Sequence, residues 1–324
     1  MPSFSLTFGG VPPYGSQRAS VCGTMHVSLI RRSMIEAGIR SVSGAHLRPA
    51  PTVARPQVIV TGDDLGFRTD WDTRVFEAYE HGFLTSTSIV TNGPTYRAAA
   101  QRLRESGRDC GVHLNLVHGE PLSPRTEVRS LVDARGNFPG TVGRFLRRYE
   151  AGLVRIGDVA LEWERQVQRA FDDGLVPSHL NSHYHLHAFP GLFRLTVDLA
   201  RRFEIGWVRV PDEPPWRAPG RAVGRARATA LWLLARWNRR VTHDIGVGLM
   251  PCRGIAASGE LGLSAWRTLL DGVCREPLDR NAIEVMCHPG QTAAEDAALF
   301  SHELASEIRA RVALRSFREL PPLP

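Results

Sequence analysis

The chain has 324 residues, a formal net charge of +7 and a hydrophobic fraction of 43%, which is enough for a folded core and excludes wholesale disorder. No apolar run approaches the roughly 18–20 residues needed to span a bilayer, which excludes an integral membrane protein. Five scattered cysteines do not make a disulfide scaffold, so we expect reduced thiols and a cytoplasmic protein. All 40 basic residues are arginines, which excludes catalysis by a lysine nucleophile.

The positive charge is concentrated in two segments. Residues 1–56 contain six arginines and one glutamate, and residues 214–243 contain seven arginines and no acid, so the rest of the chain is net acidic. A nucleic-acid-binding domain would carry a basic face on the fold itself, so we expect no nucleic-acid partner. The first segment lacks the apolar stretch of a signal peptide. We predict that residues 1–55 are a disordered extension, or reflect a start assigned too early, and that residues 56–320 form a single domain.

Taken in chain order, strands and helices alternate about six times. Short apolar, β-branched or Thr/Ser-rich runs predict strands at residues 57–62, 84–90, 111–116, 177–182, 206–210 and 283–287. Apolar residues at helical spacing predict helices at residues 70–81, 94–106, 157–173, 190–203, 218–241 and 302–317. This alternation predicts an α/β fold with a parallel sheet or barrel. Chemistry in such folds gathers at the carboxyl ends of the strands, so polar residues there are the candidates for function.

Polar side chains stand at the ends of the first and third predicted strands. Asp63 and Asp64 are neighbours and must point in different directions, so one could hold a metal while the other faces a substrate. In the third strand, His113 and Asn115 share one face and apolar residues share the other. Each pattern also has a structural interpretation, since an Asp can cap a helix and a strand histidine can belong to the core.

The densest cluster follows the fourth predicted strand. Four of the twelve histidines lie within residues 179–187, between an apolar strand and an apolar helix, which favours a metal-binding or catalytic role over a surface histidine run. If this segment is extended, three of them share a face: His183, His185 and His187. His288 follows the last strand, where a Pro-Gly turn would hold its ring at the mouth of a barrel. Cys287 faces the other way, so we expect it in the core and not as a nucleophile.

Three of these residues make a facial ligand set. Asp64, His113 and His183 offer one carboxylate and two imidazoles from three strands, and this set leaves open positions on a metal ion. A bound metal would lower the pKa of a water molecule from roughly 15.7 to about 7 and would polarise a carbonyl group. Asp63 would then be free to act as the general base. The ligand types suit zinc, iron, cobalt or nickel.

Five motifs, in order over about residues 57–290, resemble the ChbG/HpnK (YdjC-like) carbohydrate deacetylases. They are Asp-Asp-Leu-Gly from residue 63, Leu-Thr-Ser-Thr-Ser from 84, Gly-Val-His-Leu-Asn-Leu from 111, Ser-His-Tyr-His-Leu-His from 182 and Glu-Val-Met-Cys-His-Pro from 284. The resemblance implies a distorted (β/α) barrel like that of the polysaccharide deacetylases. It also implies a metal-dependent hydrolase that removes the N-acetyl group from an acetamido sugar and releases acetate and a free amine.

The resemblance implies a role for individual residues as well. One divalent ion, Mg²⁺ or Zn²⁺, would be bound by Asp64, His113 and His183. Asp63 would be the base and His288 the acid that protonates the leaving amine, although His185 or His187 could compete for the second role. Substrate contacts are expected from His185, His187, Asn115 and Arg209. The chitooligosaccharide-type enzymes have Asp where this chain has Asn181, so we assign Asn181 no essential acid–base role.

The segment Val208-Arg209-Val210-Pro211 and the basic helix after it resemble the hopanoid-biosynthesis-associated branch more than the chitooligosaccharide branch. Helix 218–241 combines arginines with Trp and Leu, so it either covers the barrel with a solvated basic face or rests on lipid as an interfacial helix. The second interpretation would bring a cytoplasmic enzyme to the inner membrane surface, where its acetamido sugar could be linked to a hopanoid or another lipid. A homodimer is a further expectation.

Two other functions remain open at this point. A metal-dependent phosphoesterase usually needs a second metal ion about 3.5–4 Å from the first, hence more carboxylates than these strand ends supply. A non-catalytic sugar- or lipid-binding relative is expected to have lost Asp63 or a metal ligand, and neither position is replaced. Metal analysis separates the two enzymes, because one ion per chain favours the deacetylase and two favour the phosphoesterase.

Overall fold

The computed structural model describes residues 55–241, 246–276 and 282–321. In this part of the chain, eight strands pair in parallel in the order β2-β3-β4-β5-β6-β7-β1-β8. They are Gln57–Leu65 (β1), Ser86–Ile89 (β2), Cys110–Leu114 (β3), His179–Ser182 (β4), Trp207–Pro211 (β5), Gly248–Arg253 (β6), Ile283–Cys287 (β7) and Ala313–Leu314 (β8). Because β2 also pairs with β1, strands β1–β7 close into a barrel, which confirms the predicted fold class.

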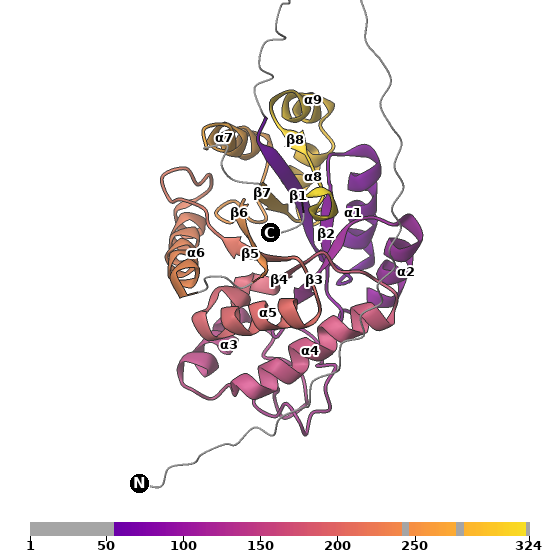
Figure 1. Cartoon of the computed structure of the whole chain (residues 1–324), viewed down its shortest axis with the longest axis vertical. Coiled ribbons are helices and arrows are strands. Elements are labelled where there is room, and N and C mark those ends of the chain that lie inside the picture. Colours follow the sequence, from indigo (N-terminus) through magenta and orange to yellow (C-terminus); the bar gives the residue numbers. More distant parts are fainter. Residues whose placement is uncertain (1–54, 242–245, 277–281, 322–324) are drawn as a thin grey trace, which may run out of the picture. The chain divides into compact units, whose positions relative to one another are not determined.

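Helices surround this barrel (Figure 1). They are Thr69–His81 (α1), Tyr96–Ser106 (α2), Val142–Glu150 (α3), Ile156–Asp172 (α4), Pro190–Arg202 (α5), Ala222–Val241 (α6), Leu263–Cys274 (α7), Ala293–Leu299 (α8) and His302–Arg311 (α9). Helix α6 packs beside β5 and α2 beside β2, so these two helices lie on opposite sides of the barrel (Figure 1). Among the helices of the described ranges, none has the length and apolarity needed to cross a bilayer.

The structure adds elements that the sequence patterns did not predict. Strand β6 contains Pro251, a residue that normally argues against a strand inside a sheet, although it pairs here with Val210 of β5. Helices α3, α7 and α8 were also unpredicted. The predicted helix 302–317 is too long, because α9 ends at Arg311 and the next residues form β8 against β1. The predicted extension, residues 1–55, lies outside the described residues except for its last residue.

The segment that carries the histidine cluster is not extended, so the condition for a shared strand face is not met. Residues His183–Ala188 form a 3₁₀ turn (η1), in which Tyr184 and His185 both have φ of 55°, in the left-handed region. This region costs a side-chain-bearing residue energy, so packing around the turn must hold it there. The chain therefore leaves the strand direction at His183, and the three histidines do not share a strand face.

Strand alternation divides the inside of the barrel into an apolar end and a polar end. Near the amino ends of the strands, an apolar cluster includes Ile59, Trp207, Met250 and Phe317. Two residues further along a strand, the same face carries polar groups, such as Thr61 and then Asp63 after Ile59. The helices cover the outer face of the barrel with the main hydrophobic core. The polar groups inside the barrel are thus buried at its carboxyl end, where we predicted the site.

Candidate active site

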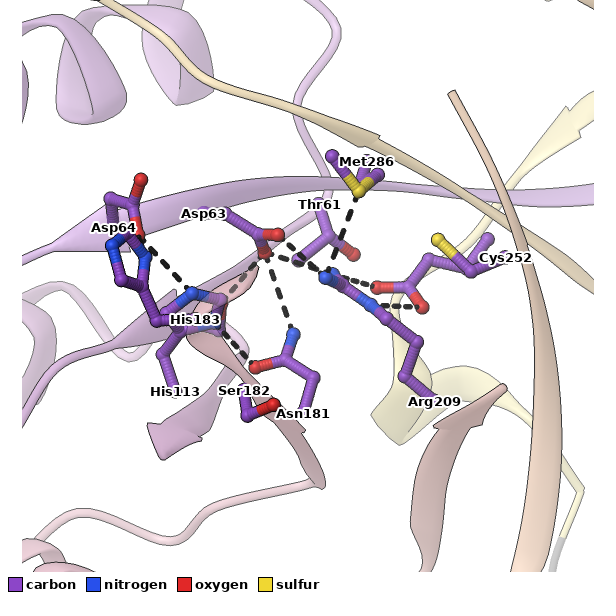
Figure 2. Close-up of polar contacts among 12 residues, drawn as sticks. Thr61, Asp63, Asp64, His113, Asn181, Ser182, His183, Arg209, Cys252 and Met286 are labelled. Carbon is purple, nitrogen blue, oxygen red and sulfur yellow. Dashed lines mark hydrogen bonds and ion pairs between the residues drawn. The ribbon is translucent and has the colours of Figure 1, made fainter. Parts of the chain in front are cut away.

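The carboxyl ends of the strands open into a cavity of about 730 Å³. Six of the predicted site residues line it: Asp63, Asp64, His113, His183, His185 and His288. They come from β1, β3, η1 and the loop after β7, which are far apart in the sequence and meet because all the strands run in one direction. Figure 2 shows how Asp64 turns toward His183 on one side while Asp63 turns toward Arg209 on the other.

Three side chains form a cluster that could hold a metal ion. The Oδ1 atom of Asp64 lies 2.8 Å from Nδ1 of His183 and 3.1 Å from Nε2 of His113. All three donor atoms lie within 4.8 Å of one another, and all three residues are buried or nearly so. One carboxylate and two imidazoles suit a divalent ion such as zinc. The residues present therefore fit the predicted metal. On metal binding, the contacts between Asp64 and the two histidines would be replaced by bonds to the ion.

The carboxylate of Asp64 is oriented by two features. Its backbone has φ of 67°, in the left-handed region, where the chain turns away from β1. Its second oxygen, Oδ2, accepts a hydrogen bond of 2.7 Å from the side chain of Gln291. Oδ1 therefore faces the two histidines, while Gln291 fixes the position of Oδ2. This arrangement leaves Oδ1 to bind an ion. Burial alone would raise the pKa of Asp64, but His183 and His113 hold it well below its usual value.

The orientation of His113 depends on two polar neighbours. Its Nδ1 atom lies 3.0 Å from the hydroxyl of Ser88 and 2.7 Å from the side-chain amide of Asn181. The Asn181 amide can place its oxygen toward His113, or it can donate from nitrogen to Nδ1 while its oxygen accepts from Arg209 at 2.8 Å. Metal binding through Nε2 requires the proton on Nδ1, and therefore an oxygen acceptor there. Ser88 and Asn181 are therefore placed to set the tautomer of His113.

A buried ion-pair network holds Asp63. Arg209 donates to both carboxylate oxygens of Asp63, at 2.5 and 2.8 Å, and also to both oxygens of Glu284, at 2.9 and 2.6 Å. Ser88 adds a hydrogen bond of 2.8 Å to Asp63. Burial would raise the pKa of Asp63, but the charge of Arg209, 0% exposed, together with the smaller effects of His113 and His288, holds it well below its usual range. Asp63 therefore stays ionised at any physiological pH.

His288 is a buried histidine that lines the cavity. Its Nδ1 atom lies 3.8 Å from Oε2 of Glu295 and has no hydrogen-bond partner among the described residues. Burial would lower the pKa of His288, but the carboxylates of Glu295, Asp64 and Asp63 raise it to about 9. The backbone nitrogen of His288 also donates to Glu295, at 2.6 Å. The ring is therefore protonated at neutral pH and can supply a proton.

The other predicted substrate contacts divide into two groups. His185 lines the cavity, and burial followed by the charge of Arg209 lowers its pKa well below the usual value, so its ring is neutral. His187 lies behind the cavity between Ser182 and the backbone oxygen of Arg209, and burial lowers its pKa to about 3. Asn115 bonds the backbone of residues 117 and 118 and so shapes the loop that carries His118.

Arg209 does not line the cavity, so the structure gives it a different place from the substrate contact that we predicted. Its guanidinium is fully buried between Asp63 and Glu284, where it can orient Asp63 without touching a ligand. His187 and Asn115 do not line the cavity either. Their hydrogen bonds support the loops that carry other residues of the site.

The outer part of the cavity is more apolar than its floor. Three rings stand around His183: Phe67 and His118 from the loops after β1 and β3, and Tyr184 from η1, with centroid distances to His183 of 5.1, 5.3 and 4.1 Å. Two helices supply the side walls, through Val142 and Leu146 of α3 and through Arg227, Ala230, Leu231 and Leu234 of α6. The cavity therefore has a charged floor at the barrel end and an aliphatic wall that rises from it.

Several residues of the site escaped the sequence analysis. Ser88 and Glu284 lie within the quoted motifs, and Gln291 and Glu295 follow the last of them, but none was given a role. Glu295 had a local signal, because Thr292 stands three residues before it as in a capping box, and Thr292 does cap α8. The Glu295 side chain instead accepts from the backbone of Leu261 and His288. No local pattern would have shown that inward turn.

Comparison with known proteins agrees with the predicted family. A family model described as YdjC-like protein matches residues 57–315. A carbohydrate deacetylase of Mus musculus is 33% identical over 249 residues, which are 73% of this chain and 78% of that protein. A carbohydrate deacetylase of Homo sapiens is 30% identical over 249 residues, or 73% and 75% of the two chains. A crystal structure from Enterococcus faecalis, of a protein named for a proposed role in cellobiose-phosphate cleavage, superposes with a TM-score of 0.63. The two sequences are 23% identical, and the superposition covers 82% of this chain and 98% of the other. This similarity supports the fold alone.

Proposed function

Since this chain belongs to the YdjC-like protein family, we propose that it is a metal-dependent carbohydrate deacetylase that removes the N-acetyl group of an acetamido sugar. The observation that carries the proposal is that one cavity brings together a three-donor metal cluster, an ionised carboxylate outside that cluster and a protonated histidine. Amide hydrolysis needs these three functions, because water must be activated and the leaving nitrogen must be protonated.

Asp64, His113 and His183 would hold the ion. A divalent ion there would lower the pKa of a bound water and polarise the acetyl carbonyl. One group of three or more potential ligands is found within the described ranges, which favours a one-metal deacetylase over the two-metal phosphoesterase. The ligand set suits zinc, and Mg²⁺ remains part of the proposal through the family resemblance.

Asp63 would accept the proton of the attacking water. Its lowered pKa makes it a weak base, so its main contribution would be to orient the water and to stabilise positive charge as the proton moves. Arg209 and Ser88 leave the carboxylate little freedom to turn, which fixes the direction of attack. We assign Arg209 a positioning role, since it acts on the reaction through Asp63.

His288 would donate its proton to the nitrogen of the departing sugar. Without that proton the nitrogen would have to leave as an amide anion, so loss of the acid should slow the reaction strongly. His185 is neutral and His187 is enclosed behind the cavity, so neither competes well for the role of acid. His185 could still accept or donate a hydrogen bond to a sugar hydroxyl, because its buried Nδ1 has no partner among the described residues.

The wall of the cavity favours a substrate with an apolar portion. Val142, Leu146, Phe189, Leu231 and Leu234 line it above the charged floor. A free sugar would leave these side chains in contact with water, whereas an aliphatic aglycone would bury them. The proposal therefore includes a lipid-linked amino sugar, such as a hopanoid-linked N-acetylglucosamine, as the natural substrate. A cytoplasmic location and a homodimer remain predictions.

The test of the function is acetate release from one soluble and one lipid-linked N-acetylglucosamine conjugate. We expect release with added Zn²⁺ or Mg²⁺, loss of release in EDTA and its recovery with excess metal. Elemental analysis of the active protein should give one ion per chain. A protein that holds one ion but releases acetate from neither conjugate would exclude this function, and two ions with phosphate-ester cleavage would favour the phosphoesterase.

The pH dependence tests the role of His288. Because its folded-state pKa is about 9, the ring is protonated below that pH and loses its proton as the pH rises through it. We expect kcat/KM to fall at alkaline pH with a midpoint at or slightly below 9, since a bound cation would offset part of the carboxylate charge. His288→Gln should lower kcat/KM about 10²- to 10⁴-fold and remove this alkaline fall. A variant with near-normal activity and an unchanged profile would exclude His288 as the acid.

A further inference from the structure

Helix α6 carries an exposed apolar stripe along its whole length. Val223, Leu233 and Trp237 are 83%, 57% and 55% exposed, and the alanines at positions 226 and 230 between them are exposed as well. The spacing of 3, 4, 3 and 4 residues places all five on one face of the helix. The opposite face, which includes Ala228, Leu231 and Ala235, is buried against the barrel. The stripe is therefore a surface of the protein and not part of its core.

Arginines flank this stripe on one side. Arg225, Arg236 and Arg240 are exposed, and α6 contains no acidic residue that could neutralise them. Trp216 adds an exposed ring, 69% accessible, that packs edge-on against Trp232 of α6. A helix with a Trp- and Leu-bearing apolar face and a basic flank has the chemistry of an interfacial helix, whose cations meet lipid phosphates while its apolar side chains enter the headgroup region.

The stripe is continuous with the wall of the catalytic cavity. Ala230 belongs to both, and its neighbours Arg227, Leu231 and Leu234 line the cavity whose floor carries Asp64 and His288. The helix that presents the exposed stripe is thus also the side wall that leads down to the metal cluster. An apolar chain lying along α6 would pass from the exposed stripe into the cavity over Ala230 and Leu234, with the side chain of Arg227 beside it.

We propose that α6 docks the protein on an anionic lipid surface, with the cavity mouth turned toward that surface. A substrate whose lipid portion stays in the bilayer would then reach the metal cluster along α6. The second statement rests on the proposed deacetylase function, whereas the docking itself does not.

The charges on α6 favour lipid over the other occupants. A second copy packed through the same face would bring the arginines of both helices together, with no acid on either α6 to pair with them. A nucleic acid would match the arginines but would leave the exposed Leu233 and Trp237 without an apolar partner. An anionic bilayer offers phosphate groups to the arginines and an apolar region to the stripe.

The test is co-sedimentation of the full chain with phosphatidylcholine vesicles, with and without phosphatidylglycerol. We expect binding to the anionic vesicles that weakens with added salt. Arg236→Glu with Arg240→Glu, and separately Leu233→Ser with Trp237→Ser, should each weaken binding at least about tenfold. The matched control is Arg97→Glu with Arg104→Glu, an equal charge change at exposed arginines of α2 on the other side of the barrel (Figure 1). It should bind within about twofold of the parent.

Equal binding of all variants, or no binding of the parent chain to anionic vesicles, would overturn the proposal. A dimer that the Leu233→Ser, Trp237→Ser variant dissociates, without vesicle binding, would assign the face to a second copy and overturn it as well. Acetate release from a soluble conjugate should be the same in all of these variants, since none of the changed residues lines the cavity. Vesicle binding without acetate release from any conjugate would leave the docking intact and remove the proposed function.

Discussion

Asp63→Asn is expected to lower kcat about 10²- to 10⁴-fold while the protein still binds one metal ion per chain. The substituted amide keeps the shape of the side chain and can still accept from Arg209, but it cannot take a proton from water. The proposed metal donors are on Asp64, His113 and His183, so the change leaves that cluster complete. Steady-state acetate release and elemental analysis on the same sample provide the two readouts.

Asp64→Asn is the matched control, because it changes the neighbouring carboxylate in the same way. It should lose the metal and the activity together, since its Oδ1 faces both histidines. If Asp63→Asn lost the metal and Asp64→Asn retained it, the roles assigned to the two carboxylates would be reversed. If Asp63→Asn kept most of its activity, another group would have to serve as the base.

Arg209→Met is expected to reduce the free energy of unfolding by about 3–5 kcal/mol, the range found when one partner of a buried ion pair is removed. The guanidinium is the buried cation that joins Asp63 to Glu284, and methionine would leave two enclosed carboxylates facing each other without it. Urea unfolding monitored by circular dichroism gives the measurement. Arg202→Met is the control, because the Arg202–Glu164 pair is 55% and 42% exposed and should contribute about 0–1 kcal/mol.

Arg209→Lys separates the effect on stability from the effect on catalysis. Lysine keeps one charge but cannot form the paired hydrogen bonds to two carboxylates, so we expect partial recovery of stability. The pKa of Asp63 should rise toward its usual value, and kcat should fall because the carboxylate is oriented less firmly. A folded Arg209→Lys protein with the kcat of the parent would contradict the positioning role of Arg209.

The strand-end rule located most of the cavity floor from the sequence. Asp63, Asp64, His113 and His288 stood at or just past predicted strands, and parallel strands bring their carboxyl ends to one side of the fold. The alternation of side chains along β1 also predicted that the two aspartates would face different partners. In the structure Asp63 contacts Arg209, whereas Asp64 contacts the histidines. These inferences needed only the period of a strand and the direction of the chain.

Local periodicity failed where the backbone or the partner was decided by distant packing. The sequence of the histidine run does not indicate that it turns, but Tyr184 and His185 adopt left-handed conformations that end the strand direction there. Helices α3 and α6 wall the cavity, yet α3 was unpredicted and nothing in the sequence of α6 indicates which of its residues face the site.

The kind of barrel and the family could be predicted from the sequence, because each depends on short motifs and on strand order. Which groups pair inside the barrel could be read from the three-dimensional structure alone. Arg209 is separated by 146 residues from Asp63 and by 75 from Glu284, and no local pattern says which inward-facing charges will meet. That pairing follows from barrel closure, since burying a charge is tolerated only where the fold brings an opposite charge to it.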